Sequence, residues 1–383
     1  MLDSIGAGKK ALIAMSGGVD SSVAALFMKE RGYECAGVTM RLFDNEDICE
    51  APSKTCCSLE DAEDARRVAA EIGIPFYIFD FSADFREQVI ERFCRSYLAG
   101  ITPNPCIDCN RYIKYDRLYR RMDLMGFDCV VTGHYARIHR DEVSGRYLLL
   151  AAGDKTKDQS YVLYMLSQDQ LAHTVFPLGD RKKEEIRRIA GKHGFVNAHK
   201  RDSQDICFVR DGDYAKFIAN YLLDKPGIEQ GGAEKSGAEA PAGMRPGNFV
   251  DRDGTLLGGH EGIVHYTIGQ RKGLGRAFGK PVYVTEIRPD TNEVVLGEDA
   301  DLFSERVTIY DINLISVADD GLAEPMRVTA KIRYNQPPMP ATAVRTGTDR
   351  IEIRFDEPQR AVTRGQAAVL YDGEIVVGGG TIL

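Results

Sequence analysis

The chain has 383 residues, 43% of them hydrophobic and 28% charged, which is ordinary for a soluble globular protein and predicts two or three domains. Its net charge of −8 argues against a protein that coats nucleic acid nonspecifically, although a local basic surface remains compatible with that charge. The first residues lack the apolar run typical of a signal peptide, and no stretch approaches the roughly 18 apolar residues needed to cross a membrane. We therefore expect a cytoplasmic protein whose nine cysteines are buried, metal-binding or catalytic.

Short apolar segments alternate with helical segments over the first half of the chain. Strands are predicted at 10–15, 33–40, 74–81 and 127–134. A first helix is predicted from about 20 to Gly32, and a second follows a possible capping box at Ser58 and Asp61. A third follows the strand at 74–81 and runs to about Gly100, and a fourth lies near 110–125. Strands separated by helices favour parallel pairing with right-handed crossovers, so we expect a doubly wound α/β sheet.

The second half has a different character. Residues 228–247 are rich in Gly, Ala, Glu and Pro and predict a flexible loop. Beyond about 282, short alternating segments separated by turn residues predict a small antiparallel β-barrel. We therefore expect an N-terminal domain over 1–208, a central domain over 209–281 and a C-terminal barrel over 282–383.

The sharpest local signal is the string Ser-Gly-Gly-Val-Asp-Ser-Ser at 16–22, between an apolar strand and a helix. Glycines let backbone amides approach a phosphate closely, and the helix N-terminus offers unpaired N–H groups. Ser16, Ser21 and Ser22 add hydroxyl donors. Asp20 is a carboxylate in an anion site, which suits a role in orienting Mg²⁺ or the loop itself. The string resembles the pyrophosphate loop of the N-type ATP pyrophosphatases, which implies cleavage of ATP between the α and β phosphates.

A second signal is the proline-stiffened loop at 102–110, which carries Cys106 and Cys109. We expect Cys109 at the start of a helix, where the dipole favours a thiolate. Arg111, Lys114, Arg117 and Arg121 follow at helical spacings and predict a cationic stripe, which could also be an ordinary solvated face.

A third signal is the segment 202–208, which contains Cys207 and follows a cationic stretch. Eight Lys or Arg residues lie between Arg181 and Arg201 against two Glu residues. Such a concentration in an acidic protein suits a polyphosphate partner. By contrast, Cys35, Cys94 and Cys129 lie in strand or helix patterns and are expected to be buried. Cys49, Cys56 and Cys57 stay open between loop thiols and a metal site.

Together these motifs resemble one family over nearly the whole chain apart from 228–247. The series SGGVDSS, CCSLEDAEDARRVA, TPNPCIDCNRYIKY, VTGHYAR, KDQSYVLY, DSQDICFV and HYTIGQRKGLG is similar to that of the bacterial tRNA-specific 2-thiouridylases. The resemblance implies a sulfurtransferase with an adenine-nucleotide alpha hydrolase-like fold that uses ATP and Mg²⁺ to replace the C2 oxygen of the wobble uridine, position 34, with sulfur. It also implies tRNA and a cysteine desulfurase or sulfur-relay protein as partners, and we expect a monomer.

The resemblance also assigns roles to residues. It makes Cys109 the nucleophile and Cys207 the persulfide carrier, with Asp20 in the catalytic set. ATP would be bound by Ala14, Met15, Ser16, Gly17, Gly18, Val19, Asp20 and Ser21, with Met40 and Gly133 lining the nucleotide site. The target base would be held by Asn104, Pro105 and Cys106, and tRNA contacted by His134, Lys157, Asp158, Gln159, Arg333, Tyr334 and Gln366.

One departure from the family pattern opens an alternative. The loop often has Asp where this chain has Cys106, so Cys106, Cys109 and Cys207 are candidate ligands for a [4Fe–4S] cluster with one open iron. The other interpretation makes Cys106 a bystander thiol and leaves the two remaining cysteines to form a transient disulfide.

Three other functions stay open on the sequence. They are thiolation of a different tRNA base by an iron–sulfur enzyme of the same superfamily, adenylation of a small substrate by another ATP pyrophosphatase, and noncatalytic RNA binding. Release of AMP and pyrophosphate that depends on tRNA separates them.

Overall fold

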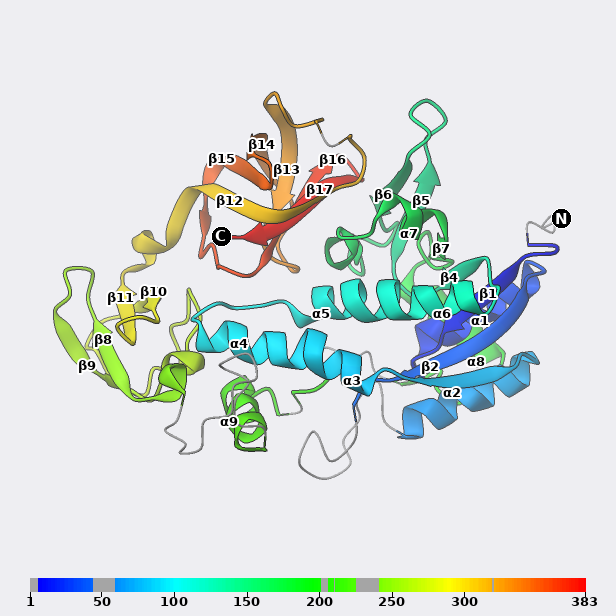
Figure 1. The fold of residues 1–383 in the computed structure, drawn as a ribbon, viewed down its shortest axis with the longest axis horizontal. Coiled ribbons are helices and arrows are strands. Elements are labelled where there is room, and N and C mark those ends of the chain that lie inside the picture. The colour runs from blue at the N-terminus through cyan, green and yellow to red at the C-terminus, as the bar shows by residue number, and fades with distance from the viewer. Residues whose placement is uncertain (1–5, 44–58, 201–205, 210, 225–240, 319) are drawn as a thin grey trace.

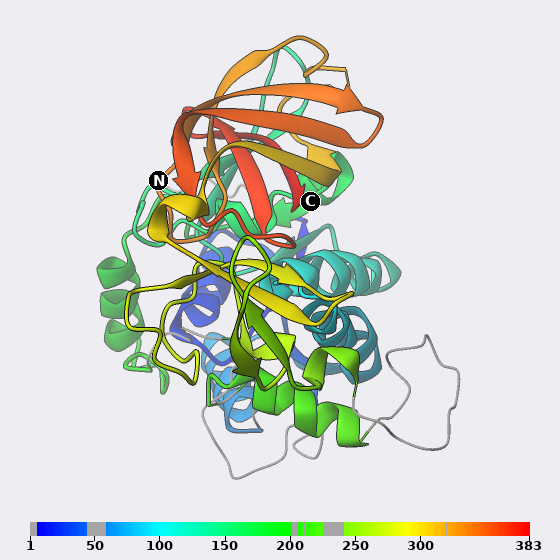
Figure 2. The same ribbon diagram turned by 90° about the vertical axis from the view of Figure 1, so that its left-hand side faces the viewer.

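The computed structural model describes residues 6–43, 59–200, 206–209, 211–224, 241–318 and 320–383. The strands form sheets of five, four and eight strands, and Figures 1 and 2 show how these are arranged around a central layer of helices. Ser58 of the predicted capping box, three cysteines (Cys49, Cys56 and Cys57) and most of 228–247 lie outside the described residues. No helix among the described residues has the length and apolar character to span a membrane.

The N-terminal sheet is parallel throughout, in the order β3-β2-β1-β4-β7. Its strands are Lys10–Ala14 (β1), Glu34–Arg41 (β2), Phe76–Asp80 (β3), Cys129–Val131 (β4) and Thr174–Val175 (β7). Leu12 packs into one core cluster, and its neighbours Ala11 and Ile13 pack into another on the opposite face. Because both faces are covered, β1 reads as a continuous apolar run, and the predicted doubly wound α/β sheet is confirmed.

Helices cover both faces of this sheet and extend beyond it. They are Val19–Glu30 (α1), Leu59–Ile72 (α2), Ser82–Phe85 (α3), Arg92–Leu98 (α4), Pro105–Asp108 (α5), Leu118–Leu124 (α6), Gln168–Ala172 (α7), Lys183–Lys192 (α8) and Tyr214–Asp224 (α9). Two π-helical segments, Arg86–Glu91 (η2) and Cys109–Arg117 (η3), join α3 to α4 and α5 to α6. Short 3₁₀ turns are Ser160–Leu163 (η4), Ala242–Met244 (η6), Ile263–His265 (η7) and Asp299–Leu302 (η8).

The two joined helices lie side by side across the middle of the molecule (Figure 1). The second one begins at Pro105 rather than near 110 as predicted. Proline suits the first helical position because it has no N–H to leave unpaired, and the side chain of Asn104 accepts a hydrogen bond from the Ile107 amide at 3.4 Å. The helix that carries Cys109 therefore starts inside the proline loop itself.

A four-stranded sheet contains Gly247–Val250 (β8), Leu256–His260 (β9), Tyr283–Arg288 (β10) and Glu293–Gly297 (β11). Its order is β10-β11-β8-β9, with β11 parallel to β8. The hairpin over 283–297 therefore pairs with the central region, although the alternation of its sequence suggested the start of the barrel at 282. The sheet wraps around a small core that includes Phe249, Val284 and Val294.

The C-terminal strands are Phe303–Leu314 (β12), Met326–Lys331 (β13), Met339–Gly347 (β14), Arg350–Arg360 (β15), Ala367–Asp372 (β16) and Ile375–Ile382 (β17). Because β12 pairs with both β15 and β17, these six strands close into the expected antiparallel barrel. Ala136–Arg140 (β5) and Tyr147–Ala151 (β6) continue the sheet from β17. Strands from the N-terminal half thus attach the barrel to the α/β sheet, and the division into three domains stays a prediction.

Candidate active site

The predicted phosphate loop joins β1 to α1. Gly18 is the N-cap of α1 and no side chain caps the helix, so the first-turn amides have no side-chain acceptor. The hydroxyls of Ser21 and Ser22 donate to the carbonyl oxygen of Gly18 at 3.0 and 3.1 Å. In this structure both hydroxyls therefore bond to the backbone, and the prediction that they donate to a phosphate stays a prediction. Ser16 is exposed.

Gly17 is fixed by its neighbours from two directions. It has a φ of +73°, and an added Cβ would lie 2.3 Å from the carbonyl oxygen of Asp61 at the start of α2. On the other side, the buried Asn197 side chain donates to the Gly17 carbonyl at 3.0 Å and to the Ser22 hydroxyl at 2.9 Å. The loop is therefore a rigid cradle that accepts only glycine at this position. Asn197 was not among the predicted site residues.

Asp20 points back into the protein. Its carboxylate accepts hydrogen bonds from the Tyr135 hydroxyl at 2.7 Å and from the Lys183 ammonium at 2.6 Å. The Lys183 side chain is only 8% exposed, so a buried cation from α8 pairs with Asp20, and the sequence did not single it out. Lys183 belongs to the cationic stretch at 181–201, but composition alone does not say which lysine turns inward. Both carboxylate oxygens of Asp20 are engaged by protein donors. Of the two predicted roles, orienting the loop therefore fits this arrangement better than coordinating Mg²⁺.

The remaining predicted nucleotide residues lie near the carboxyl ends of adjacent parallel strands, where such sheets bind ligands. The Met15 carbonyl accepts from the Thr39 hydroxyl at 2.6 Å, which joins the ends of β1 and β2. Met40 is half-buried on β2 and packs against the first core cluster. Gly133 follows β4, and an added Cβ there would lie 2.8 Å from the Ser21 amide nitrogen. Gly133 therefore lies directly against the start of α1.

The two cysteines of the proline loop occupy different turns of one helix. Cys106 is exposed in the first turn of α5, whereas Cys109 is half-buried at the first residue of η3. The helix-dipole argument made for Cys109 therefore applies to Cys106, because the helix starts at Pro105 and not near Cys109. A π-helical segment is often found at a functional site, and here it begins at Cys109.

Cys207 comes from a distant part of the chain and packs against the same core cluster as Cys109. Cys109 and Cys207 are both half-buried and both pack against the core cluster that contains Phe93 and Phe208. Among the described residues, no group of three or more His, Cys, Asp or Glu side chains is placed to hold a metal ion. Cys106, Cys109 and Cys207 therefore do not form the iron–sulfur ligand set that the sequence left open.

The basic residues after Cys109 do not form one cationic stripe. Arg111 pairs with Asp311 of the barrel, Arg117 donates to Asp84 at 2.7 Å, and Arg121 lies over the Phe79 ring. The α-helical spacing that predicted the stripe fails because η3 closes hydrogen bonds five residues apart. Next to Cys109, burial raises the pKa of Asp108 to about 6 against the opposing effects of Arg92 and Arg111.

Several residues expected to contact tRNA are committed to bonds inside the protein. His134 is buried, its Nδ1 lies 2.7 Å from the Thr132 hydroxyl, and burial lowers its pKa. The Gln159 side chain accepts from the Tyr135 amide at 2.9 Å. Asp158 accepts from the Ala152 amide at 3.0 Å and from the Ser160 hydroxyl at 2.9 Å. These three side chains hold the loops of the site in place, and Lys157 beside them is half-buried.

The barrel residues meet the proline loop. Gln366 donates to the carbonyl oxygens of Thr102 and Pro103 at 3.0 and 3.1 Å. These bonds hold the proline loop, which continues into Asn104 and Cys106. Arg333 donates to the Ala361 carbonyl at 2.6 Å. Tyr334 is 37% exposed; burial, the Asp158 carboxylate and the nearby Cys106 thiol raise its pKa to about 12.

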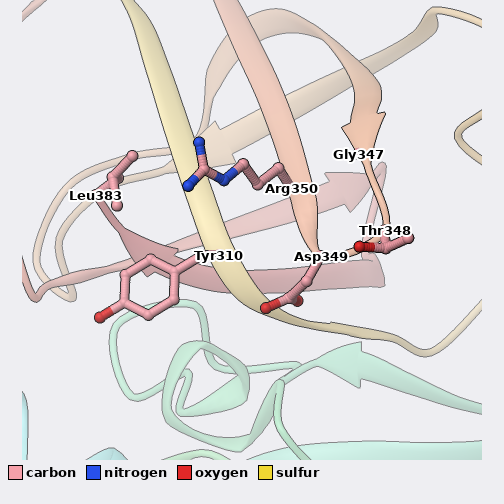
Figure 3. Close-up of a pocket in the computed structure, with 6 residues that line it drawn as sticks. All are labelled: Tyr310, Gly347, Thr348, Asp349, Arg350 and Leu383. Carbon is pink, nitrogen blue, oxygen red and sulfur yellow. The ribbon is translucent and has the colours of Figure 1, made fainter.

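A separate pocket of about 350 Å³ lies on the barrel (Figure 3). Its lining consists of Tyr310, Gly347, Thr348, Asp349, Arg350 and Leu383, none of which the sequence singled out. Asp349 is occupied in supporting β12, because its carboxylate accepts from the Asp311 and Ile312 amides at 3.0 and 2.9 Å. The predicted site residues lie elsewhere.

Comparison with known proteins covers almost the whole chain. Residues 9–211 match the family model described as tRNA methyl transferase HUP domain, 239–298 the tRNA methyl transferase PRC-barrel domain, and 304–382 the aminomethyltransferase beta-barrel domain. A tRNA-specific 2-thiouridylase of Clostridioides difficile is 51% identical over 374 residues, or 98% of each chain. One from Carboxydothermus hydrogenoformans is 48% identical over 376 residues, 98% of this chain and 97% of that one. A solved 4-thiouridine synthetase–RNA complex with bound ATP covers 58% of this chain and 53% of that chain at 18% identity and a TM-score of 0.32, too weak a likeness to carry an argument.

Proposed function

The chain belongs to the tRNA-specific 2-thiouridylase family, and from that membership we propose that it uses ATP to replace the C2 oxygen of the wobble uridine of tRNA, at position 34, with sulfur. The observation that carries the proposal is 51% identity to a relative of that name over 98% of both chains. The phosphate loop, the two half-buried thiols and the barrel that holds the proline loop are the parts such a reaction needs.

ATP supplies the activation. The C2 oxygen of the uridine attacks the α-phosphorus, pyrophosphate leaves, and the base becomes an adenylate whose leaving group is AMP. The uncapped amides at the start of α1 and the buried Lys183 ammonium support a role in holding the phosphates. Tyr135 and Asp20 orient that ammonium. Mg²⁺ would accompany the phosphates, where it neutralises charge and polarises the phosphoryl group.

Two cysteines carry the sulfur. The terminal sulfur of a Cys207 persulfide attacks C2, AMP leaves, and the base is joined to Cys207 through an S–S bond. The Cys109 thiolate then attacks the Cys207 sulfur, which breaks that bond, releases the 2-thiouridine and leaves a Cys109–Cys207 disulfide. A thiol reductant reduces the disulfide, and a cysteine desulfurase or relay protein restores the persulfide. Both thiols pack against one core cluster, which is compatible with their meeting in this reaction.

We divide the residues expected to serve tRNA binding into those that would contact the RNA directly and those that would hold the contacting loops in place. The target uridine must leave its stack to expose C2, and Asn104, Pro105 and Cys106 would receive it. Lys157, Arg333 and the exposed ring of Tyr334 would contact the RNA nearby. His134, Asp158, Gln159 and Gln366 would act from beneath, through the bonds that hold these loops. We propose that the protein acts as a monomer.

The test is a thiolation assay on an unmodified tRNA transcript with ATP, Mg²⁺ and a persulfide donor. We expect 2-thiouridine at position 34, identified by mass spectrometry, with equal amounts of AMP and pyrophosphate released only when tRNA is present. Sulfur at another base would favour the alternative substrate, and release of pyrophosphate without tRNA would favour a small substrate. RNA binding with no turnover would reject an enzyme. Cys207→Ser is expected to abolish thiolation, whereas Cys94→Ser, a buried thiol elsewhere in the same core cluster, is expected to retain it.

A further inference from the structure

A buried lysine without an acidic partner lies on the barrel beside the proline loop. Lys331 is the last residue of β13 and only 8% exposed. Its ammonium lies 5.7 Å from the centre of the Tyr161 ring and 5.8 Å from that of Tyr334. Within the part of the chain that the structure describes, it makes no hydrogen bond and no ion pair. A cation in this position is costly, and two aromatic rings offset only part of that cost.

The nearest acid does not satisfy this cation. The charge of Asp158 acts on Lys331, but the carboxylate is occupied by the Ala152 amide at 3.0 Å, the Ser160 amide at 3.1 Å and the Ser160 hydroxyl at 2.9 Å. Burial dominates and lowers the pKa of Lys331. The charge of Asp158 therefore opposes the effect of burial on Lys331, but the carboxylate is not a direct partner of the ammonium.

A second cation reinforces this surplus of positive charge. Arg333 lies two residues further along and donates to the Ala361 carbonyl at 2.6 Å and the Thr363 hydroxyl at 3.3 Å, both neutral groups. Burial and the charge of Arg360 lower the pKa of Arg333. Arg333 is thus bonded to neutral oxygens, and Lys331 lies over aromatic rings. Two cations without a direct acidic partner make a site that suits an anion.

The position of the site identifies that anion. Tyr334 connects Lys331 with the proline loop. Its ring faces the Lys331 ammonium, and Tyr334 lies close enough to Cys106 for that thiol to raise the pKa of the tyrosine. Gln366 holds the same loop through Thr102 and Pro103. An anion at Lys331 would therefore lie next to the segment proposed to receive the target base. The phosphates of ATP have their own cradle at the start of α1, in the other half of the site.

We propose that Lys331, framed by Tyr161 and Tyr334, binds a backbone phosphate of the substrate RNA next to the nucleotide held by Asn104–Cys106. This proposal rests on the proposed function and adds a positioning contact to it. The phosphodiester supplies the charge that the barrel lacks, and the rigid aromatic frame fixes the distance between that phosphate and the base. Lys331 thereby sets which nucleotide of the anticodon loop enters the site.

The test compares Lys331→Met with Lys331→Arg and with Lys280→Met, in which an exposed lysine of the four-stranded region loses its pairing with Glu298. The probe is an unmodified anticodon stem-loop RNA with uridine at the wobble position. We expect Lys331→Met to weaken binding about tenfold and to reduce the slope of log affinity against log salt by about 0.7, as for one lost single-strand phosphate contact. Lys331→Arg is expected to recover most of the affinity, and Lys280→Met to match the wild type.

Methylphosphonate substitution tests the contact without changing the protein. Neutralising one phosphate next to the target uridine is expected to weaken wild-type binding about tenfold and to have little further effect on Lys331→Met. If Lys331→Met fails to fold, the same comparison is made with Lys331→Gln. Unchanged binding across all phosphates flanking the target would overturn the proposal. Thiolation of the same RNA by the wild type separates the two ideas, because its absence rejects the proposed function instead.

Discussion

Arg111 of η3 and Asp311 of β12 are joined by two hydrogen bonds across 200 positions of sequence, the Nη2–Oδ1 contact being 2.9 Å. Arg111 lies two residues after Cys109, and the Asp311 amide donates to Asp349, which links it to the next hairpin of the barrel. The pair therefore fixes the turn that carries Cys109, the proposed nucleophile, against the barrel. Because two donors meet two acceptors, the contact sets orientation as well as distance.

Breaking this pair is expected to affect catalysis more than stability. Both side chains are more than a third exposed, so a double-mutant cycle with Arg111→Met and Asp311→Asn should give a coupling of about 1 kcal/mol or less in the free energy of unfolding. We expect kcat for thiolation to fall about tenfold in Arg111→Met, because a small displacement of the nucleophile is costly. Arg327 and Asp356, a paired couple within the barrel, provide the matched control, and Arg327→Met should leave kcat unchanged.

Gly17→Ala is expected to destroy the phosphate loop, because the methyl group meets backbone that cannot move aside. The added Cβ would lie 2.3 Å from the Asp61 carbonyl, and the φ of +73° adds strain. We expect a loss of about 3 kcal/mol or more in urea unfolding and no measurable pyrophosphate release. Gly194 has the same φ of +73° with open space around it, so Gly194→Ala should cost only about 1 kcal/mol. Equal effects of the two changes would contradict the close packing of Gly17 on α2.

The sequence predicted the parts of this site that depend on local pattern. The apolar run of β1, the glycines after it and the apolar positions of α1 lie close together in the chain, and the structure confirms that strand–loop–helix unit. The start of the second central helix was misplaced because the two prolines suggested a loop, whereas Pro105 begins the helix. The hairpin at 283–297 was assigned to the barrel because alternation shows that a strand exists but not which strand it pairs with.

Contacts between distant residues were beyond the sequence. Lys183 reaches Asp20 across 163 positions, and Gln366 reaches Thr102 across 264. Lys183 looks the same in the sequence as Lys182, which precedes it, and only the direction of α8 turns one of them inward. Motif resemblance placed Gln366 near the RNA, but its amide is used to hold the proline loop. Residue type and spacing thus indicated which segments belong to the candidate site. Only the fold shows which of their side chains are bonded inside the protein.

Lys183 and Asp20 allow a structural role to be separated from a role in binding phosphate. Lys183→Met should lower the free energy of unfolding by about 3 kcal/mol, because it leaves a partly buried carboxylate without its cation. It should also raise KM for ATP more than about tenfold. Adding Asp20→Asn should restore part of the stability, since the unpaired charge is gone, but none of the ATP affinity. Recovery of both in the double variant would show that Lys183 serves only the fold.

Asp108 predicts a pH dependence of stability. Burial raises its pKa from 3.8 to about 6, with Arg92 and Arg111 opposing that shift and Asp311 adding to it. A raised folded-state pKa means that the protonated carboxyl is favoured by folding, so its stabilisation is complete below pH 4 and is lost as pH rises to about 6. Relative to Asp108→Asn, the wild type should lose on the order of 2 kcal/mol between pH 4 and 7 and change little above that. Urea unfolding of both proteins at each pH measures this difference, and a constant difference would contradict it.

The cysteines should differ sharply in reactivity, and the order follows from burial. Burial raises the pKa of Cys35 to about 11 and that of Cys94 and Cys129 to about 12, so these thiols are both protonated and covered. Cys106, by contrast, is exposed in the first turn of α5 and is open to reagents.

We expect iodoacetamide at pH 8 to modify Cys106 within minutes and the three buried thiols only after denaturation, as followed by peptide mass spectrometry. Cys106→Ser should remove the fast label without accelerating the others. If Asn104–Cys106 receives the target base, unmodified tRNA should slow the reaction of Cys106 with the native protein, while labelling of the denatured protein should not change. Rapid native labelling of Cys94 would contradict the buried core around Phe93, whereas failure of tRNA to protect Cys106 would instead argue against that loop as the place where the base is held.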